Sequence, residues 1–138
     1  MTFPFISDMI FNTLKYISMI FFLIFLGVFL NAMAQLLLKA GMTHIGHFEF
    51  SVANLLPIGI KVALSPSIIT GLFFYVLSVV IWLLVLSRVQ VSYAYPMLSV
   101  GYIINAFAAY LLFGEPLSIL RMTGIFIIMT GVYLVAQS

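Results

Sequence analysis

An all-α integral membrane protein, built as a bundle of four membrane-spanning helices, is the fold class that this sequence predicts. Of its 138 residues, 65% are hydrophobic and only 6% are charged, whereas a soluble domain is about half apolar and a quarter charged. So few charges cannot coat a water-soluble surface of this size. The five basic residues stand singly, without the basic patch that nucleic-acid phosphates require. A soluble enzyme, a disordered chain and a nucleic-acid binder are therefore excluded.

The four expected spans follow from the lengths of the apolar stretches. A bilayer core about 30 Å thick requires roughly 20 apolar residues in a helix, because lipid offers an open backbone no hydrogen-bond partners. Four stretches meet or approach that length and make one membrane domain, 1–138: residues 17–38, 67–86, 94–113 and 117–136.

The only long connection covers residues 40–66. Within it, residues 50–64 are apolar enough to form a short helix in the membrane interface, with Lys61 toward the headgroups, although Pro57 and Gly59 interrupt the segment. The remaining connections are a few residues each, which leaves no room for a soluble domain.

Local sequence signals predict where the third and fourth spans begin and whether the first span is cleaved as a signal peptide. We expect Pro96 in the first turn of the third span, where its missing N–H costs nothing, and Ser118 as the cap of the fourth. The sequence 32–34, Ala-Met-Ala, imitates a signal-peptide cleavage site. Because the apolar run continues to Leu38, we expect the first span to be retained.

Three polar residues of the first span form the main candidate site. Asn31, Gln35 and Lys39 are spaced four apart, so at about 100° per residue they share one stripe of a helix. Polar groups inside a membrane are costly and point to function. The amides supply donors and acceptors, and Lys39 supplies positive charge for a phosphate. The alternative is that the amides bind neighbouring helices and that Lys39 reaches to the headgroups.

The third span carries further candidates. Gly101, Asn105 and Ala109 repeat every four residues and make a small-residue face with one amide. Tyr93 and Tyr95 lie at the edge of the span, where tyrosines line a sugar-binding groove or form an interfacial belt.

The end of the chain offers one carboxylate and one candidate interface. Glu115 follows the third span, where it could pair with Arg121 or simply set the turn. Gly124 and Gly131 are seven residues apart and lie on one face of the last span, so they predict a dimer seam.

Neither an enzyme signature nor a cofactor motif is present. The chain has no cysteine, no Ser/His/Asp set and no glycine-rich phosphate loop. His44, His47 and Glu49 lie close together, but zinc sites usually take three or four protein ligands, and no other metal-binding residue is near in sequence. We therefore expect neither a metal nor a cofactor.

The basic residues give almost no orientation bias. Lys15 and Arg88 fall on one side of the membrane, and Lys39, Lys61 and Arg121 on the other. A difference of one charge predicts either dual orientation or an orientation fixed by a partner, unless so few charges carry no information.

Several short motifs resemble the drug/metabolite transporter superfamily, whose small multidrug resistance-type members match this chain in size. They are Gln-Leu-Leu-Leu-Lys-Ala-Gly at 35–41, Tyr-Ala-Tyr-Pro-Met-Leu-Ser at 93–99 and Gly-Glu-Pro-Leu-Ser at 114–118. The drug exporters of this type carry a membrane glutamate where Asn31 stands and favour tryptophan where Pro96 stands. Because an amide cannot carry the coupling proton, these departures argue against proton-coupled cation export.

The same motifs are most similar to those of the aminoarabinose-phosphoundecaprenol flippase subunits, which share Gln-x3-Lys, Ala-Tyr-Pro-Met-Leu-Ser and Glu-Pro-x-Ser. The resemblance implies translocation of a polyprenyl-phosphate-linked sugar, or a related lipid, across the bacterial inner membrane. It also implies a homodimer, or a heterodimer with a similar four-helix subunit, and the balanced charges permit an antiparallel pair.

A flippase, or a subunit of one, is therefore the function that we expect. The predicted substrate-binding residues are Asn31, Gln35, Lys39, Tyr93, Tyr95, Asn105 and Glu115. Two alternatives stay open: a small-metabolite or drug exporter, which needs a coupling carboxylate that the spans lack, and a membrane assembly subunit that transports nothing.

Overall fold

The computed structural model describes residues 4–49 and 51–137, and every regular element among them is a helix. The helices are α1 (Pro4–Ile45), α2 (Val52–Leu64), α3 (Pro66–Leu86), α4 (Val91–Met97), α5 (Val100–Phe113) and α6 (Ile119–Ala136). Three segments are long and apolar enough to cross a membrane, namely most of α1, α3, and α4 together with α5; α6 is apolar but shorter. The predicted all-α, multi-pass membrane class is confirmed.

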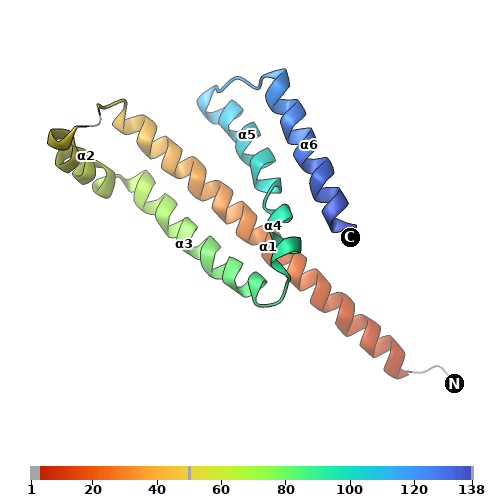
Figure 1. Ribbon diagram of the computed structural model, residues 1–138. Helices are drawn as coiled ribbons and strands as arrows, with labels where there is room; N and C mark the ends of the chain where they lie inside the picture. The colour runs from red at the N-terminus through yellow and green to blue at the C-terminus, as the bar shows by residue number, and fades with distance from the viewer. Residues whose placement is uncertain (1–3, 50, 138) are drawn as a thin grey trace.

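Helix α1 is the axis of the molecule (Figure 1). It runs from end to end, with α3 antiparallel along one side and α5 and α6 on the other, and its N-terminal part projects beyond the remaining helices. Its 42 residues correspond to about 63 Å, roughly twice the thickness of a bilayer core.

Helix α1 also continues past the predicted end at residue 38. It ends at Ile45 because Gly46 takes a positive φ of 82°, a conformation that costs glycine nothing and commonly closes a helix. The Gly46 N–H donates to the Met42 carbonyl at 3.1 Å. Lys39 consequently lies inside a helix, more than one turn from its end.

Small residues let α1 and α3 approach closely. Gly27, Ala34 and Gly41 repeat every seven residues, a spacing that keeps them on one seam of the helix. A Cβ added at Gly41 would overlap Ile68 Cγ1, and one added at Gly71 of α3 would lie 3.2 Å from the Ala34 carbonyl oxygen. This seam fixes the two helices against each other.

The buried core lies where α1, α3 and α4 meet. Ile24, Val28, Val85 and Ala94 are each at most 4% exposed, and α5 adds partly buried side chains such as Ile104 around them. The core is small, so most apolar side chains face outward, as they do in a protein whose surface contacts lipid.

The connection expected as a loop over 40–66 is largely helical. The last turns of α1 occupy its beginning, and α2 follows as the expected short helix, with Pro57 inside it and Lys61 in its last turn. The expected start of this helix at residue 50 lies outside the described residues. Helix α2 contacts the neighbouring ends of α1 and α3.

The third predicted span is broken, and the prediction for Pro96 was wrong. Helix α4 begins at Val91, so Pro96 is its sixth residue and not part of the first turn. Since proline has no N–H to donate and its ring crowds the preceding turn, the helix ends one residue later. The chain turns at Leu98 and Ser99, the Ser99 hydroxyl donates to the Pro96 carbonyl, and α5 starts at Val100.

A tight turn joins α5 to α6. Gly114 closes α5 with a φ of 65°, and the Glu115 N–H donates to the Ala109 carbonyl at 3.3 Å. The predicted cap is confirmed, since the Ser118 hydroxyl accepts a hydrogen bond from the Arg121 N–H at 3.2 Å. From Ile119 to Val135, no side chain of α6 is buried.

Candidate functional site

A cavity of about 400 Å³ lies between α1 and α5; we call it the central cavity. Its size falls in the range of small-molecule sites. Its lining consists of Asn31, Gln35, Leu36, Lys39, Tyr102, Asn105, Ala109 and Phe113.

Helical periodicity explains both walls of the central cavity. The predicted stripe of Asn31, Gln35 and Lys39 forms the α1 wall because residues four apart stay on one side of a helix. On α5, the face that carries Asn105 and Ala109 turns toward the stripe for the same reason. A cation and three amide side chains therefore meet in one cavity.

An ion pair links the α1 wall to the turn between α5 and α6. Lys39 Nζ lies 3.3 Å from Glu115 Oε1, and Arg121 Nη1 lies 3.9 Å from Glu115 Oε2. The Arg121 guanidinium also donates to the Pro116 carbonyl at 3.1 Å. The positive φ of Gly114 reverses the chain here and so brings Glu115 between the two cations.

Asn105 carries an unpaired acceptor. Its Oδ1 atom is buried and has no hydrogen-bond partner. A buried polar atom without a partner costs roughly 1–3 kcal/mol, so its presence calls for an explanation. Asn105 is also one of the residues that line the central cavity.

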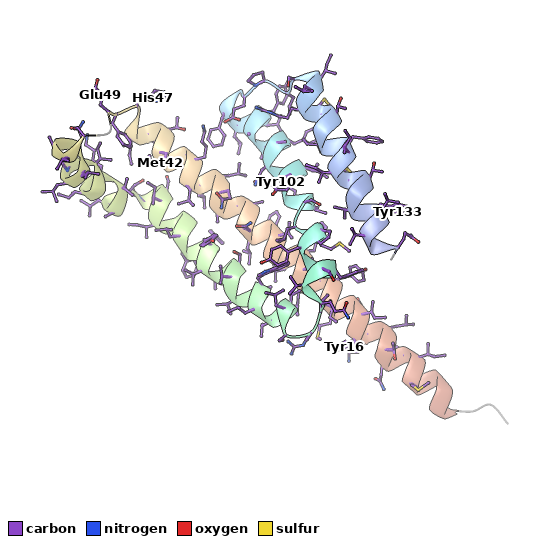
Figure 2. All side chains as sticks on the ribbon, in the orientation of Figure 1. Tyr16, Met42, His47, Glu49, Tyr102 and Tyr133 are labelled. Carbon is purple, nitrogen blue, oxygen red and sulfur yellow. The ribbon has the colours of Figure 1, made fainter. Side chains whose placement is uncertain are left out.

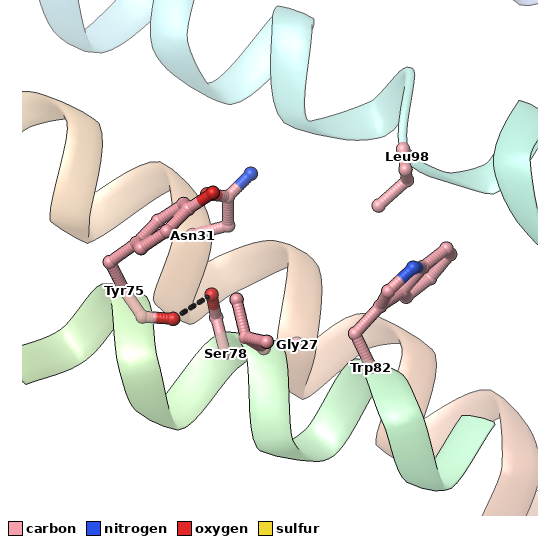
Figure 3. Close-up of a pocket in the computed structure, with 7 residues that line it drawn as sticks. Gly27, Asn31, Tyr75, Ser78, Trp82 and Leu98 are labelled. Atoms are coloured by element: carbon pink, nitrogen blue, oxygen red, sulfur yellow. Dashed lines mark hydrogen bonds between the residues drawn. The ribbon is translucent and has the colours of Figure 1, made fainter. Parts of the chain in front are cut away.

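A second, smaller hollow lies next to the central cavity, and we call it the Trp82 cleft. Its volume is about 140 Å³, and its lining is Gly27, Asn31, Tyr75, Ser78, Val79, Trp82 and Leu98. Figure 3 shows Asn31 and Tyr75 at one end and Trp82 and Leu98 at the other. Asn31 lines both hollows, so the two are neighbours.

A third hollow, the end groove, surrounds the last turns of α1. It is lined by Lys39, Met42, Thr43, Gly46, His47 and Phe48. Figure 2 shows Met42 and His47 at this end of α1, and Tyr16 on the projecting opposite part. Because Lys39 lines both the end groove and the central cavity, the three hollows follow one another along α1.

The sequence has clear relatives. "Probable 4-amino-4-deoxy-L-arabinose-phosphoundecaprenol flippase subunit ArnF" of Proteus mirabilis (strain HI4320) is 36% identical over 119 residues, covering 78% of this chain and 84% of the relative. The chain belongs to the family of these flippase subunits. The ArnF protein of Serratia proteamaculans (strain 568) is 34% identical over 112 residues, 79% of this chain and 85% of the relative.

Members of both subunit types of the family match. The ArnE protein of Pseudomonas fluorescens (strain Pf0-1) is 38% identical over 73 residues, covering 53% of this chain and 64% of the relative. No family model and no solved structure matches the chain. The predicted resemblance to the aminoarabinose-phosphoundecaprenol flippase subunits is confirmed, and these relatives are transporters and not enzymes.

In this flippase-subunit chain, three predicted residues are not part of the cavity lining: Glu115, which lies beside the cavity as the partner of Lys39, and two tyrosines. Tyr93 and Tyr95 belong to α4, beyond the break at Leu98, and neither lines the cavity. The Tyr95 ring packs edge-on against Trp82, with ring centroids 5.7 Å apart. Tyr95 is therefore connected to the Trp82 cleft and not to Lys39.

Several lining residues of this family member were missing from the predicted site, among them Tyr102, Trp82 and Leu98. Tyr102 lies one turn before Asn105 and shares its face, so the period of the helix could have found it. Trp82 of α3 lines its cleft together with Leu98, which lies at the break after α4, and Pro96 is the sequence signal that could have predicted that break. Within residues 4–49 and 51–137, no three His, Asp or Glu side chains gather as for a metal ion.

Proposed function

We propose that this chain is a subunit of a flippase that moves a polyprenyl-phosphate-linked sugar across the bacterial inner membrane. In this proposal, the polar head passes through the central cavity while the lipid tail stays in the bilayer. The observation that carries the proposal is the position of Lys39, a cation in a cavity otherwise walled by amides, a tyrosine and apolar side chains. The relatives supply the cargo class, since their names specify 4-amino-4-deoxy-L-arabinose-phosphoundecaprenol.

Lys39 binds the phosphate by exchanging its counter-ion. The Lys39 and Glu115 side chains are 54% and 36% exposed, and an ion pair with this exposure contributes only about 0–1 kcal/mol. A lipid phosphate can therefore take the place of Glu115 at little cost. Glu115 keeps a partner meanwhile, because Arg121 lies on its other oxygen.

The sugar is recognised by the amide side chains. Asn31 and Gln35 offer donors and acceptors along α1, and Asn105 Oδ1 accepts from a hydroxyl or amino group of the sugar. Tyr102 adds an apolar ring with a hydroxyl, a combination that suits a sugar face. Tyr93 and Tyr95 remain predicted contacts of the path on the far side of the helix break.

The acidic residues argue against a drug exporter. The chain has three of them, Asp8, Glu49 and Glu115, and none falls within the four apolar stretches. A proton-coupled exporter of cations requires an acidic group inside the membrane that binds proton and drug in turn. Glu115, which pairs with the cavity residue Lys39, is already shared between Lys39 and Arg121.

A second subunit completes the assembly, with all four apolar stretches crossing the membrane. Helix α6 contacts α4 and α5, and most of its described side chains are exposed. A Cβ added at Gly124 or Gly131 would meet no atom within 4 Å, so this face can receive a closely packed helix. The partner is a second copy or a similar four-helix subunit, arranged parallel or antiparallel.

Substitution of Lys39 tests the proposed function. The variant Lys39→Met keeps the apolar stem and removes the charge, so we expect it to lose display of the glycolipid on the outer leaflet. A membrane-impermeant amine-reactive label on intact cells measures this display, and an immunoblot measures protein level. Lys61→Met, on α2 away from the cavity, is the matched control, and Lys39→Arg should retain part of the activity. Normal display and normal protein level in Lys39→Met would refute the proposal.

A further inference from the structure

We propose that the Trp82 cleft holds the first isoprene units of the lipid whose head occupies the central cavity. This inference rests on the proposed function and adds a binding site for the tail. Three observations carry it: the depth of the cleft along α1, the chemistry of its lining, and its continuity with the central cavity through Asn31.

The position of the cleft along α1 fits the path of a lipid tail into the bilayer. Lys39 lies near the level of the first turn of α3, because Gly41 packs against Ile68. Asn31 and Gly27 lie two and three turns further along α1, about 12 and 18 Å from Lys39. Half of a bilayer core is about 15 Å, so a lipid with its phosphate at Lys39 directs its tail toward the cleft.

The lining of the cleft suits hydrocarbon. Ser78 is buried, but its hydroxyl donates to the Tyr75 carbonyl at 2.7 Å, so it needs no partner from a bound molecule (Figure 3). The Trp82 indole and Leu98 supply apolar surface at one end of the cleft, Val79 adds to it, and Asn31 and Tyr75 lie at the other end. The central cavity differs, because a lysine and three amide side chains line it. The apolar end of the cleft is thus the place for hydrocarbon, and the central cavity is the place for the polar head.

The size and the opening of the cleft fit the first isoprene units of a lipid tail. Its volume of about 140 Å³ is close to the roughly 150 Å³ that holds a benzene-sized hydrocarbon elsewhere, enough for one or two branched isoprene units. Val79 is 39% exposed, so the rim reaches the outer surface of α3 and the rest of a long tail can leave sideways into the bilayer.

The sole tryptophan of the chain reports directly on this site. The purified protein is reconstituted in vesicles of brominated phosphatidylcholine, whose bromine atoms quench the Trp82 fluorescence on contact. Undecaprenyl phosphate, added at a few mole per cent, should displace the brominated chain and relieve most of the quenching. Undecaprenol, which lacks the phosphate, should also relieve the quenching, but only at a higher concentration. It should do so in the Lys39→Met variant as well. A soluble sugar phosphate without a tail should have no effect.

A filled cleft provides the matched comparison. Val79→Phe places a ring in the cleft and should abolish the relief by undecaprenyl phosphate, whereas Val80→Phe, on the more exposed neighbour, should preserve it. The tail site would be refuted if undecaprenyl phosphate did not relieve the quenching in the wild-type protein. It would also be refuted if phosphatidic acid relieved the quenching equally well, because any phosphate lipid would then enter the cleft. Glycolipid display that persists in Lys39→Met would instead refute the proposed function and leave the fluorescence result to decide the tail site.

Discussion

Lys39 of α1 and Glu115 of the turn between α5 and α6 form an ion pair at 3.3 Å, although 75 residues of the chain separate them. The pair joins the longest helix to the element that reverses the chain after α5. Under the proposed function, Glu115 competes with the lipid phosphate for the Lys39 ammonium. Removal of the Glu115 charge should then raise the affinity for that phosphate.

Replacing Glu115 by Gln should strengthen the binding of undecaprenyl phosphate. An ion pair with this exposure is worth about 0–1 kcal/mol, so removing the competing charge should raise the affinity by up to about fivefold. Titration of the lipid into vesicle-bound protein measures the change. Glu49→Gln, an exposed carboxylate without a charged partner in the described ion pairs, should bind like the wild-type protein. An unchanged or lower affinity in Glu115→Gln would contradict the exchange of counter-ions.

Replacing Asn105 by Leu should stabilise the protein and weaken sugar recognition together. The substitution removes a buried acceptor without a partner, whose cost is about 1–3 kcal/mol, while the side-chain volume stays similar. Thermal unfolding in detergent should therefore occur at a higher temperature. Binding of the sugar-bearing lipid should fall, and binding of bare undecaprenyl phosphate should not. If both lipids lose affinity equally, Asn105 acts on the fold of the cavity and not on the sugar.

Replacing Gly41 by Ala should destabilise the fold. The added Cβ would overlap Ile68 Cγ1 and would lie 3.3 Å from the Ile68 backbone nitrogen, so α1 and α3 must separate at this end. Overpacking of this kind costs about 1–3 kcal/mol, which a lower unfolding temperature should report. The control is Gly59→Ala in α2, where the added Cβ would meet nothing within 4 Å. Equal stability of the two variants would show that the seam is looser than described.

Replacing both Gly124 and Gly131 by Leu should prevent assembly while the single chain still folds. Neither position has an atom of the same chain within 4 Å of an added Cβ, so the larger side chains are accommodated in the monomer. They would, however, hold a partner helix away from α6. Crosslinking in membranes and size-exclusion chromatography in detergent measure the assembly. A double variant that assembles normally would place the interface elsewhere.

The part of the site that follows helical periodicity could be predicted from the sequence. Asn31, Gln35 and Lys39 share a stripe whatever the neighbours are, and Asn105 shares a face with Gly101 and Ala109. The contact between Lys39 and Glu115 could not be predicted in this way. It requires that α5 lie against α1 and that Gly114 turn the chain back, and both depend on tertiary packing.

Two errors in the predicted helices have one physical origin. A hydropathy pattern shows where a span must be apolar, and it does not show how far the helix continues beyond the membrane. Helix α1 thus passes residue 38 until Gly46 stops it. Helix α4 likewise starts before the apolar stretch, which puts Pro96 inside it. The break that follows places Leu98 in the lining of the Trp82 cleft, so this contact was missed together with the helix boundary.

The contacts to α3 and the proposed contacts to the cargo occupy adjacent faces of α1. Gly27, Ala34 and Gly41 hold α3 through close backbone contact, while Asn31, Gln35 and Lys39 line the central cavity. If the proposed function holds, the amides can change during evolution, and with them the accepted sugar, while the three small residues keep the two helices in contact. Across related chains, we expect the three small residues to vary least and positions 31 and 35 to diverge as the transported molecules diverge.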